Sequence, residues 1–137
     1  MKLLDTNAII AILTGRQPAV RSHLKRDMSA GTAITISPIV LSELWYGTAK
    51  STRVTENAER ILTFLAGGFT VLDFDGEDAR IAGEIRAELE RAGTPIWPYD
   101  LLIAAQSLRR NATLVTANVS DFARVSGLRW EDWSRAA

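Results

Sequence analysis

The sequence contains no cysteine and only one histidine, His23. The absence of cysteine excludes disulfides, zinc–thiolate sites and cysteine nucleophiles. His23 lies beside Lys25 and Arg26, a pattern typical of a solvated helix face, and nothing around it supports a Ser-His-Asp triad. A metal-free nuclease that uses paired histidines is excluded, because the chain has only one histidine.

Charge of one sign is not in excess either, because 16 acidic residues balance 16 lysines and arginines. The overall charge therefore indicates neither nucleic acid nor a membrane as a partner. The apolar run before Asp5 is only two leucines long, too short for a signal peptide, and no stretch approaches the ~20 apolar residues of a membrane span. We expect a cytoplasmic protein with no membrane partner. Its 137 residues fit one domain, residues 1–137, with room for a hydrophobic core.

Apolar patterning and helix-ending residues predict strands that alternate with helices. The expected strands are 2–4, 33–36, 69–72, 113–116 and 128–130, and the expected helices are 8–13, 19–28, 38–47, 52–66, 76–92 and 98–110. Strands separated by helices predict an α/β fold: a central, mostly parallel β-sheet of four to five strands, flanked by helices on both faces.

Three carboxylates occur where apolar side chains are expected, namely Asp5, Glu43 and Asp100. No Lys or Arg lies within three residues of Glu43 or Asp100, and an unpaired buried charge is costly, so a shared divalent cation is one explanation. In a parallel sheet the ligand site lies beyond the carboxyl ends of the strands. Asp5 and Asn118 each follow a predicted strand, and we expect all four side chains to converge at that edge.

Each carboxylate also has a purely structural explanation. Glu43 falls at the rim of an amphipathic helix, Asp100 is in a first helical turn that favours negative charge, and Asp5 is a plausible N-cap. Taken together in an alternating fold, the three indicate a site of oxygen ligands, which selects Mg²⁺ or Mn²⁺. Such ions activate water and offset charge at a phosphodiester.

Five segments resemble one known family in their order and spacing: residues 4–7, 37–47, 98–105, 114–122 and 127–133. They resemble the PIN-domain ribonucleases and, within them, the toxin subunits of bacterial VapBC toxin–antitoxin modules. The resemblance spans the whole chain. It implies a PIN-like fold and a Mg²⁺- or Mn²⁺-dependent endoribonuclease that cuts RNA and arrests translation. It also implies a cognate antitoxin that neutralises the toxin, and a homodimer.

The resemblance also assigns roles to residues. It makes Asp5 and Asp100 direct metal ligands, with Glu43 completing the acidic cluster, and it gives Asn7 and Thr116 the task of organising the site through hydrogen bonds.

One position departs from the family pattern. Many PIN domains have a fourth acid in the motif that follows the last core strand, and this chain has Asn118 there. An asparagine keeps an acceptor oxygen but loses the charge. Asp121 is near enough in sequence to substitute, although a cap or surface role is its first interpretation, so the number of metal ions stays open.

Two other α/β enzyme and signalling classes fail on these residues. Haloacid-dehalogenase phosphatases need a second aspartate where this chain has Asn7, and both they and receiver domains need a late lysine. The only lysines are Lys2, Lys25 and Lys50. The remaining alternative is a PIN fold that binds RNA or protein without cutting.

Several basic and aromatic residues are candidates for contacts with RNA or with a partner protein. Lys50, Arg53 and Arg109 are candidates for a basic rim that meets RNA. The aromatic residues Trp45, Tyr46 and Trp97 stack bases, line an antitoxin groove or pack in the core. The apolar stripe of the helix at 76–92 favours packing between two copies, as expected for a homodimer.

Overall fold

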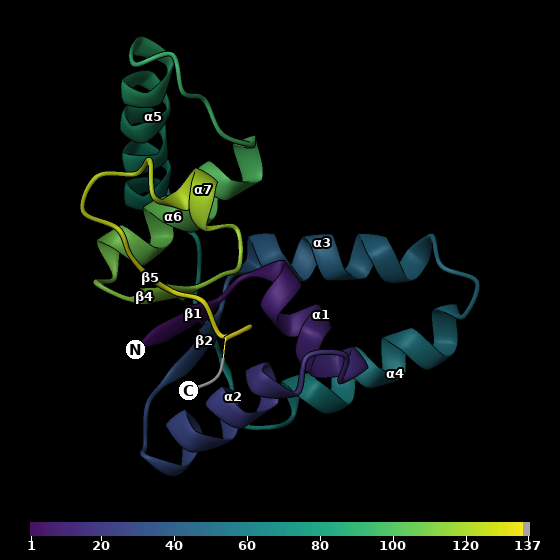
Figure 1. Ribbon diagram of the computed structural model, residues 1–137. Coiled ribbons are helices and arrows are strands. Elements are labelled where there is room, and N and C mark those ends of the chain that lie inside the picture. The colour runs from purple at the N-terminus through teal and green to yellow at the C-terminus, as the bar shows by residue number, and fades with distance from the viewer. Residues whose placement is uncertain (136–137) are drawn as a thin grey trace.

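The computed structural model describes residues 1–135 and is built around a five-stranded parallel sheet with helices on both sides (Figure 1). The strands are β1 (Lys2–Leu4), β2 (Ile34–Ile36), β3 (Thr70–Val71), β4 (Thr113–Val115) and β5 (Arg129–Glu131). The helices are α1 (Thr6–Thr14), α2 (Pro18–Ser29), α3 (Pro38–Ala49), α4 (Val54–Leu65), α5 (Gly76–Arg91), α6 (Pro98–Arg109) and α7 (Val119–Phe122). Every helix within residues 1–135 is too short or too polar to span a bilayer.

The sheet has the strand order β3-β2-β1-β4-β5, and every neighbouring pair is parallel. The chain runs outward from β1 to β2 and β3, then returns to β4 and β5 on the other side of β1. The order therefore reverses between β1 and β4, which is where open α/β sheets bind ligands. Leu4 is in register with Val115, so the residues that follow these two strands emerge side by side.

The predicted α/β fold with a parallel sheet is confirmed, and most element boundaries differ from the prediction by one or two residues. The helix expected to end near Gly47 continues to Ala49, because Gly47 keeps a helical backbone rather than the positive φ that ends a helix. Residues 119–122 form a short helix that the sequence pattern did not indicate.

The helix α6 lies at the centre of the core, in keeping with apolar residues on nearly all its sides. Its buried residues are Leu101, Ile103, Ala104, Ala105, Gln106 and Ser107. The apolar stripe of α5 packs against α6 of the same chain through Ala82, Ile85 and Leu89. The reason given above for a homodimer was therefore wrong, since that stripe is already buried.

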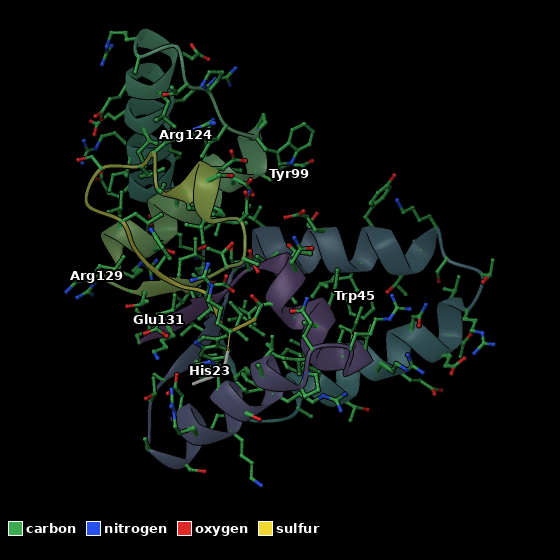
Figure 2. The ribbon with its side chains drawn as sticks, viewed as in Figure 1. His23, Trp45, Tyr99, Arg124, Arg129 and Glu131 are labelled. Atoms are coloured by element: carbon green, nitrogen blue, oxygen red, sulfur yellow. The ribbon has the colours of Figure 1, made fainter. Side chains whose placement is uncertain are left out.

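The prediction of a solvated His23 was also wrong. His23, labelled in Figure 2, is only 8% exposed. Its ring stacks on Trp133 with 5.5 Å between the ring centroids. Lys2 Nζ lies 5.6 Å from the Trp133 ring and pairs with Asp27 at 2.6 Å and with Glu131 at 2.9 Å. These contacts fasten the C-terminal segment onto α2 and β1, and a local pattern around His23 could not have indicated them.

Candidate active site

Asp5 leaves the end of β1 and enters the first turn of α1. Its backbone N–H donates to the Val115 carbonyl at 3.0 Å, which fixes it beside the end of β4. Its carboxylate accepts a hydrogen bond from the backbone N–H of Ala8 at 2.8 Å and another from the Thr116 hydroxyl. Asp5 is thus the N-cap of α1, as its structural explanation required, and it also points to the edge of the sheet.

Glu43 lies in the second turn of α3 and is half-buried. Its Oε1 accepts a hydrogen bond from the Thr6 hydroxyl at 3.0 Å. This bond joins α3 to the start of α1 and brings Glu43 to the same edge as Asp5. Thr6 gave no signal for a role in orienting Glu43, because the two residues are 37 positions apart in the sequence.

Asp100 lies in the first turn of α6, and its carboxylate is contacted by Asn118 rather than by a cation. Asn118 Nδ2 donates to Asp100 Oδ2 at 3.4 Å and to Asp121 Oδ2 at 3.1 Å. Asp121 is in turn 3.6 Å from Arg124 Nη1. The backbone N–H of Asn118 donates to the Thr116 hydroxyl at 2.9 Å. One asparagine amide therefore bridges two carboxylates and stands where the family pattern has an acid.

These side chains line one small pocket of about 120 Å³, called the carboxylate pocket below. Its lining residues are Asp5, Thr6, Asn7, Glu43, Asp100, Ile103, Asn118 and Phe122. The predicted convergence of Asp5, Glu43, Asp100 and Asn118 is confirmed by this arrangement. Ile103 and Phe122 form its apolar part, and they were missed because apolar residues on buried helices give no separate signal for a site.

The electrostatics of the pocket show crowded negative charge. Burial raises the pKa of the Asp5 carboxyl, and its bonds from Thr116 and Ala8 offset only part of that rise. The pKa of Asp100 rises to about 6, first because of burial and then because of the charges of Glu43, Asp5 and Asp121. Two carboxylates that resist ionisation at one sheet edge form a place where a cation is favourable.

A divalent cation fits the chemistry of these donors, which are all oxygen atoms and are mostly charged. Within residues 1–135, however, no group of three or more His, Cys, Asp or Glu side chains forms a ready-made metal site. The fit therefore rests on donor chemistry and on the raised pKa values of Asp5 and Asp100. The assignment of Asp5, Glu43 and Asp100 as ligands stays a prediction, as does that of Asp121.

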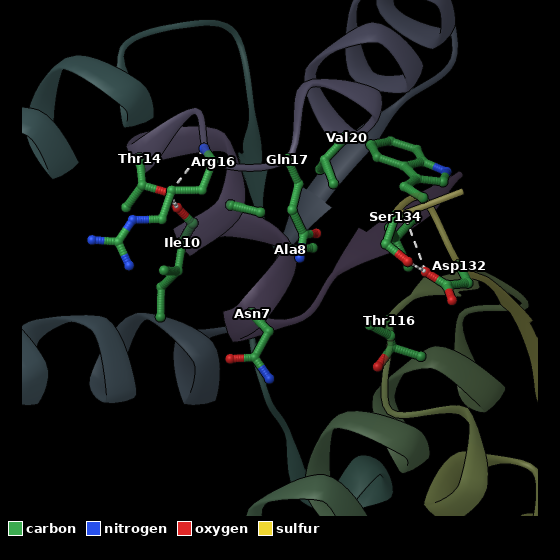
Figure 3. Close-up of a pocket in the computed structure, with 14 residues that line it drawn as sticks. Asn7, Ala8, Ile10, Thr14, Arg16, Gln17, Val20, Thr116, Asp132 and Ser134 are labelled. Atoms are coloured by element: carbon green, nitrogen blue, oxygen red, sulfur yellow. Dashed lines mark hydrogen bonds between the residues drawn. The ribbon is translucent and has the colours of Figure 1, made fainter. Parts of the chain in front are cut away.

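A larger cavity of about 310 Å³ adjoins the site between α1, the start of α2 and the C-terminal segment (Figure 3). Asn7 and Thr116 line one end of it, and Gln17 and Val20 line the other. Asp132 is the acidic residue that lines this cavity, and its carboxylate accepts a hydrogen bond from the backbone N–H of Ser134 at 2.9 Å. The concentration of carboxylates places the candidate chemistry in the smaller pocket.

The predicted basic rim is only partly compatible with the structure. Arg109 ends α6 at the opposite end from Asp100 and pairs with Asp75 and Asp78, so it does not border the pocket. Lys50 lies over the ring of Tyr46, with 4.7 Å from Nζ to the centroid.

The predicted contact aromatics are not core residues. Trp45, Tyr46 and Trp97 are 36%, 67% and 60% exposed, which removes core packing as their main role.

Arg53, the remaining residue of the predicted basic rim, pairs with Glu56 on α4, at 3.4 Å.

Comparison with known proteins identifies the family. The PIN domain model matches residues 2–128. The chain is 39% identical over 132 residues to a Shigella flexneri protein named tRNA(fMet)-specific endonuclease VapC, with 96% of this chain and 97% of that protein covered. It is similar to the solved structure of VapBC2 from Rickettsia felis bound to a DNA fragment from their promoter, at a TM-score of 0.89 and 35% identity, covering 96% and 98% of the two chains. It is likewise similar to DNA-bound VapBC from Salmonella typhimurium, at a TM-score of 0.88 and 38% identity, covering 96% and 97%. The chain belongs to the PIN-domain family.

Proposed function

We propose that this protein is the toxin of a toxin–antitoxin module and that it cleaves RNA with Mg²⁺ or Mn²⁺ held by Asp5, Glu43 and Asp100. The observation that carries the proposal is the meeting of these three carboxylates in one pocket at the strand-order reversal. Relatives that match nearly the whole chain are named as ribonucleases or as a tRNA endonuclease, which gives the substrate class.

A bound cation would supply Lewis acidity at the scissile phosphodiester and would make an attacking water more acidic. The chain's own residues set the geometry. Thr116 orients Asp5, Thr6 orients Glu43, and the Asn118 amide holds Asp100 in place. Because these carboxylates are held by hydrogen bonds in a partly buried pocket, they need little reorganisation when the substrate arrives.

Asn118 and Asp121 act as positioning residues in this proposal. Asp121 is held between the Asn118 amide and Arg124, so it influences Asp100 through Asn118 and through its charge. The proposal needs no metal ligation by Asp121, which stays a separate prediction.

Partners follow from the same relatives. The similar solved structures are complexes of VapB and VapC proteins, so the chain is expected to bind a cognate antitoxin and to be inhibited by it. A homodimer and a cytoplasmic location stay predictions, and light scattering of the purified chain would test the first.

The test is RNA cleavage by purified protein. We expect cleavage in Mg²⁺ or Mn²⁺, loss of cleavage in EDTA, and a loss of at least about a hundredfold in Asp5→Asn, since each lost ligand weakens a site worth several kcal/mol. Asp73→Asn changes an exposed carboxylate outside the carboxylate pocket and is the matched control. Full cleavage in EDTA would refute the metal mechanism. RNA binding without cleavage in any metal would favour the non-catalytic alternative.

A further inference from the structure

Two aromatic side chains stand exposed immediately before Asp100. Trp97 is 60% exposed and Tyr99 is 48% exposed. Their rings meet edge to face, with 5.9 Å between the centroids and 89° between the planes. Large apolar surface left open to water usually marks a contact with another molecule. This pair, called the aromatic pair below, has no role in the mechanism described above.

Helix geometry places Tyr99 at the rim of the carboxylate pocket, and the edge-to-face contact holds Trp97 beside Tyr99. Ile103 lines that pocket, and it follows Asp100 by three residues and Tyr99 by four. Residues three and four apart lie on the same side of a helix, so Asp100 and Tyr99 both lie one turn before Ile103 on the side of α6 that borders the pocket. Figure 2 shows Tyr99 at the start of α6, and the hydrogen bond from Asn118 to Asp100 joins this end of α6 to the start of α7.

The loop that carries Trp97 is held in one conformation. Pro98 restricts the Trp97 backbone to an extended shape, observed at φ −57° and ψ 135°. Ile96 packs against the core. Arg124 Nη1 donates to the Pro95 carbonyl at 3.2 Å. A ring that is already fixed loses little conformational entropy when a ligand stacks on it.

The charges around the pair favour a nucleotide over an apolar protein segment. Arg124 is partly exposed and is hydrogen-bonded to the Pro95 carbonyl, so a cation lies on the same loop as Trp97. The carboxylates of the pocket repel a polyanion, and the whole chain has a net charge of zero. RNA affinity must therefore come largely from contacts other than charge, and base stacking on aromatic rings is one that tolerates any sequence.

We propose that Trp97, supported edge-on by Tyr99, is a stacking platform for an unpaired base next to the scissile phosphate, with Arg124 near the adjoining phosphate. The inference rests on the proposed ribonuclease function and adds how that site holds its substrate. Trp97 is thereby a substrate-binding residue, and differences in stacking strength give it a modest preference among bases.

The experiment measures binding apart from cleavage, by fluorescence anisotropy in Ca²⁺ buffer with three labelled probes of equal length and charge. The probes are an oligoadenylate, an oligouridylate and an oligomer of abasic ribose phosphate. We expect Trp97→Leu to weaken oligoadenylate binding about tenfold, oligouridylate binding less, and abasic binding not at all. Trp97→Phe should restore most of the loss, and Trp130→Leu, an exposed tryptophan on β5, should change nothing.

Equal weakening for all three probes, or none for any, would overturn the proposal. So would a Trp97→Leu variant that binds RNA normally but no longer binds the co-expressed antitoxin, because the aromatic pair would then belong to a protein interface. A wild-type protein that binds oligoadenylate through Trp97 but cuts no RNA in either Mg²⁺ or Mn²⁺ would refute the proposed catalysis and leave the platform standing. Absence of any RNA binding would refute both.

Discussion

Replacing Asp100 by asparagine should make the metal-free protein more stable, although it removes a carboxylate of the proposed active site. The folded-state pKa of Asp100 is raised from 3.8 to about 6. A raised acid pKa means that ionisation of Asp100 destabilises the folded state. This destabilisation is absent below about pH 4 and complete above about pH 6. At neutral pH the wild type therefore bears this cost, and Asp100→Asn does not.

The size of the effect follows from the shift. About two pKa units correspond to about 3 kcal/mol, and solvent screening of this half-exposed group reduces the figure to about 1–2 kcal/mol. Loss of the favourable charge in the first turn of α6 subtracts part of that. The net expectation is a gain of about 1 kcal/mol in the free energy of unfolding, or roughly 3–5 °C in Tm.

The assay is thermal and urea unfolding in EDTA, with Asp78→Asn as the matched control. Asp78 is also in the first turn of a helix, but it is fully buried and accepts bonds from Arg109 and the Asp75 backbone. The same change there should lower stability by on the order of 2 kcal/mol, because charged partners lose their counterion. If both variants were destabilised alike, the carboxylate pocket would not be a place of unrelieved negative charge.

Three further predictions concern other parts of the molecule. Asn118→Asp should lower the stability of the metal-free protein and tighten Mn²⁺ binding about tenfold or more in calorimetric titrations, because a carboxylate replaces a neutral oxygen; unchanged binding would exclude this position from metal affinity. The pKa of Asp75 is lowered to about 2 by its bond from Arg109, so its pairing stabilises the fold above about pH 4 and is lost as the pH falls toward 2. The difference in urea stability between wild type and Asp75→Asn should therefore shrink over that range, and a constant difference would count against the pairing. Trp133→Ala should cost about 3 kcal/mol or more in urea unfolding, since this buried ring packs on His23; a loss under about 1 kcal/mol would show that the C-terminal segment adds little.

The sheet edge that carries the site was predictable because two short-range signals agree there. Asp5 and Asn118 each follow an apolar strand, and topology alone brings the ends of parallel strands together. Asp100 was predictable from its place at the start of a long buried helix.

Contacts between distant segments were not predictable in this way. His23 looked solvated because its neighbours are charged, and only Trp133 from the other end of the chain buries it. On α4 the buried residue is Ile61, while its apolar neighbour Leu62 is 58% exposed. Periodicity shows which residues share a side of a helix, and tertiary packing decides how much of that side is covered.

The central claim is that Asp5, Glu43 and Asp100 jointly hold the divalent cation that makes this PIN domain a nuclease. A crystal structure of the protein with Mn²⁺, read by anomalous scattering, tests it most directly. The account predicts an anomalous peak within bonding distance of Asp5 and Asp100 oxygens, absent from Asp100→Asn crystals. A Mn²⁺ peak bound elsewhere, with the carboxylate pocket empty at saturating metal, would contradict it.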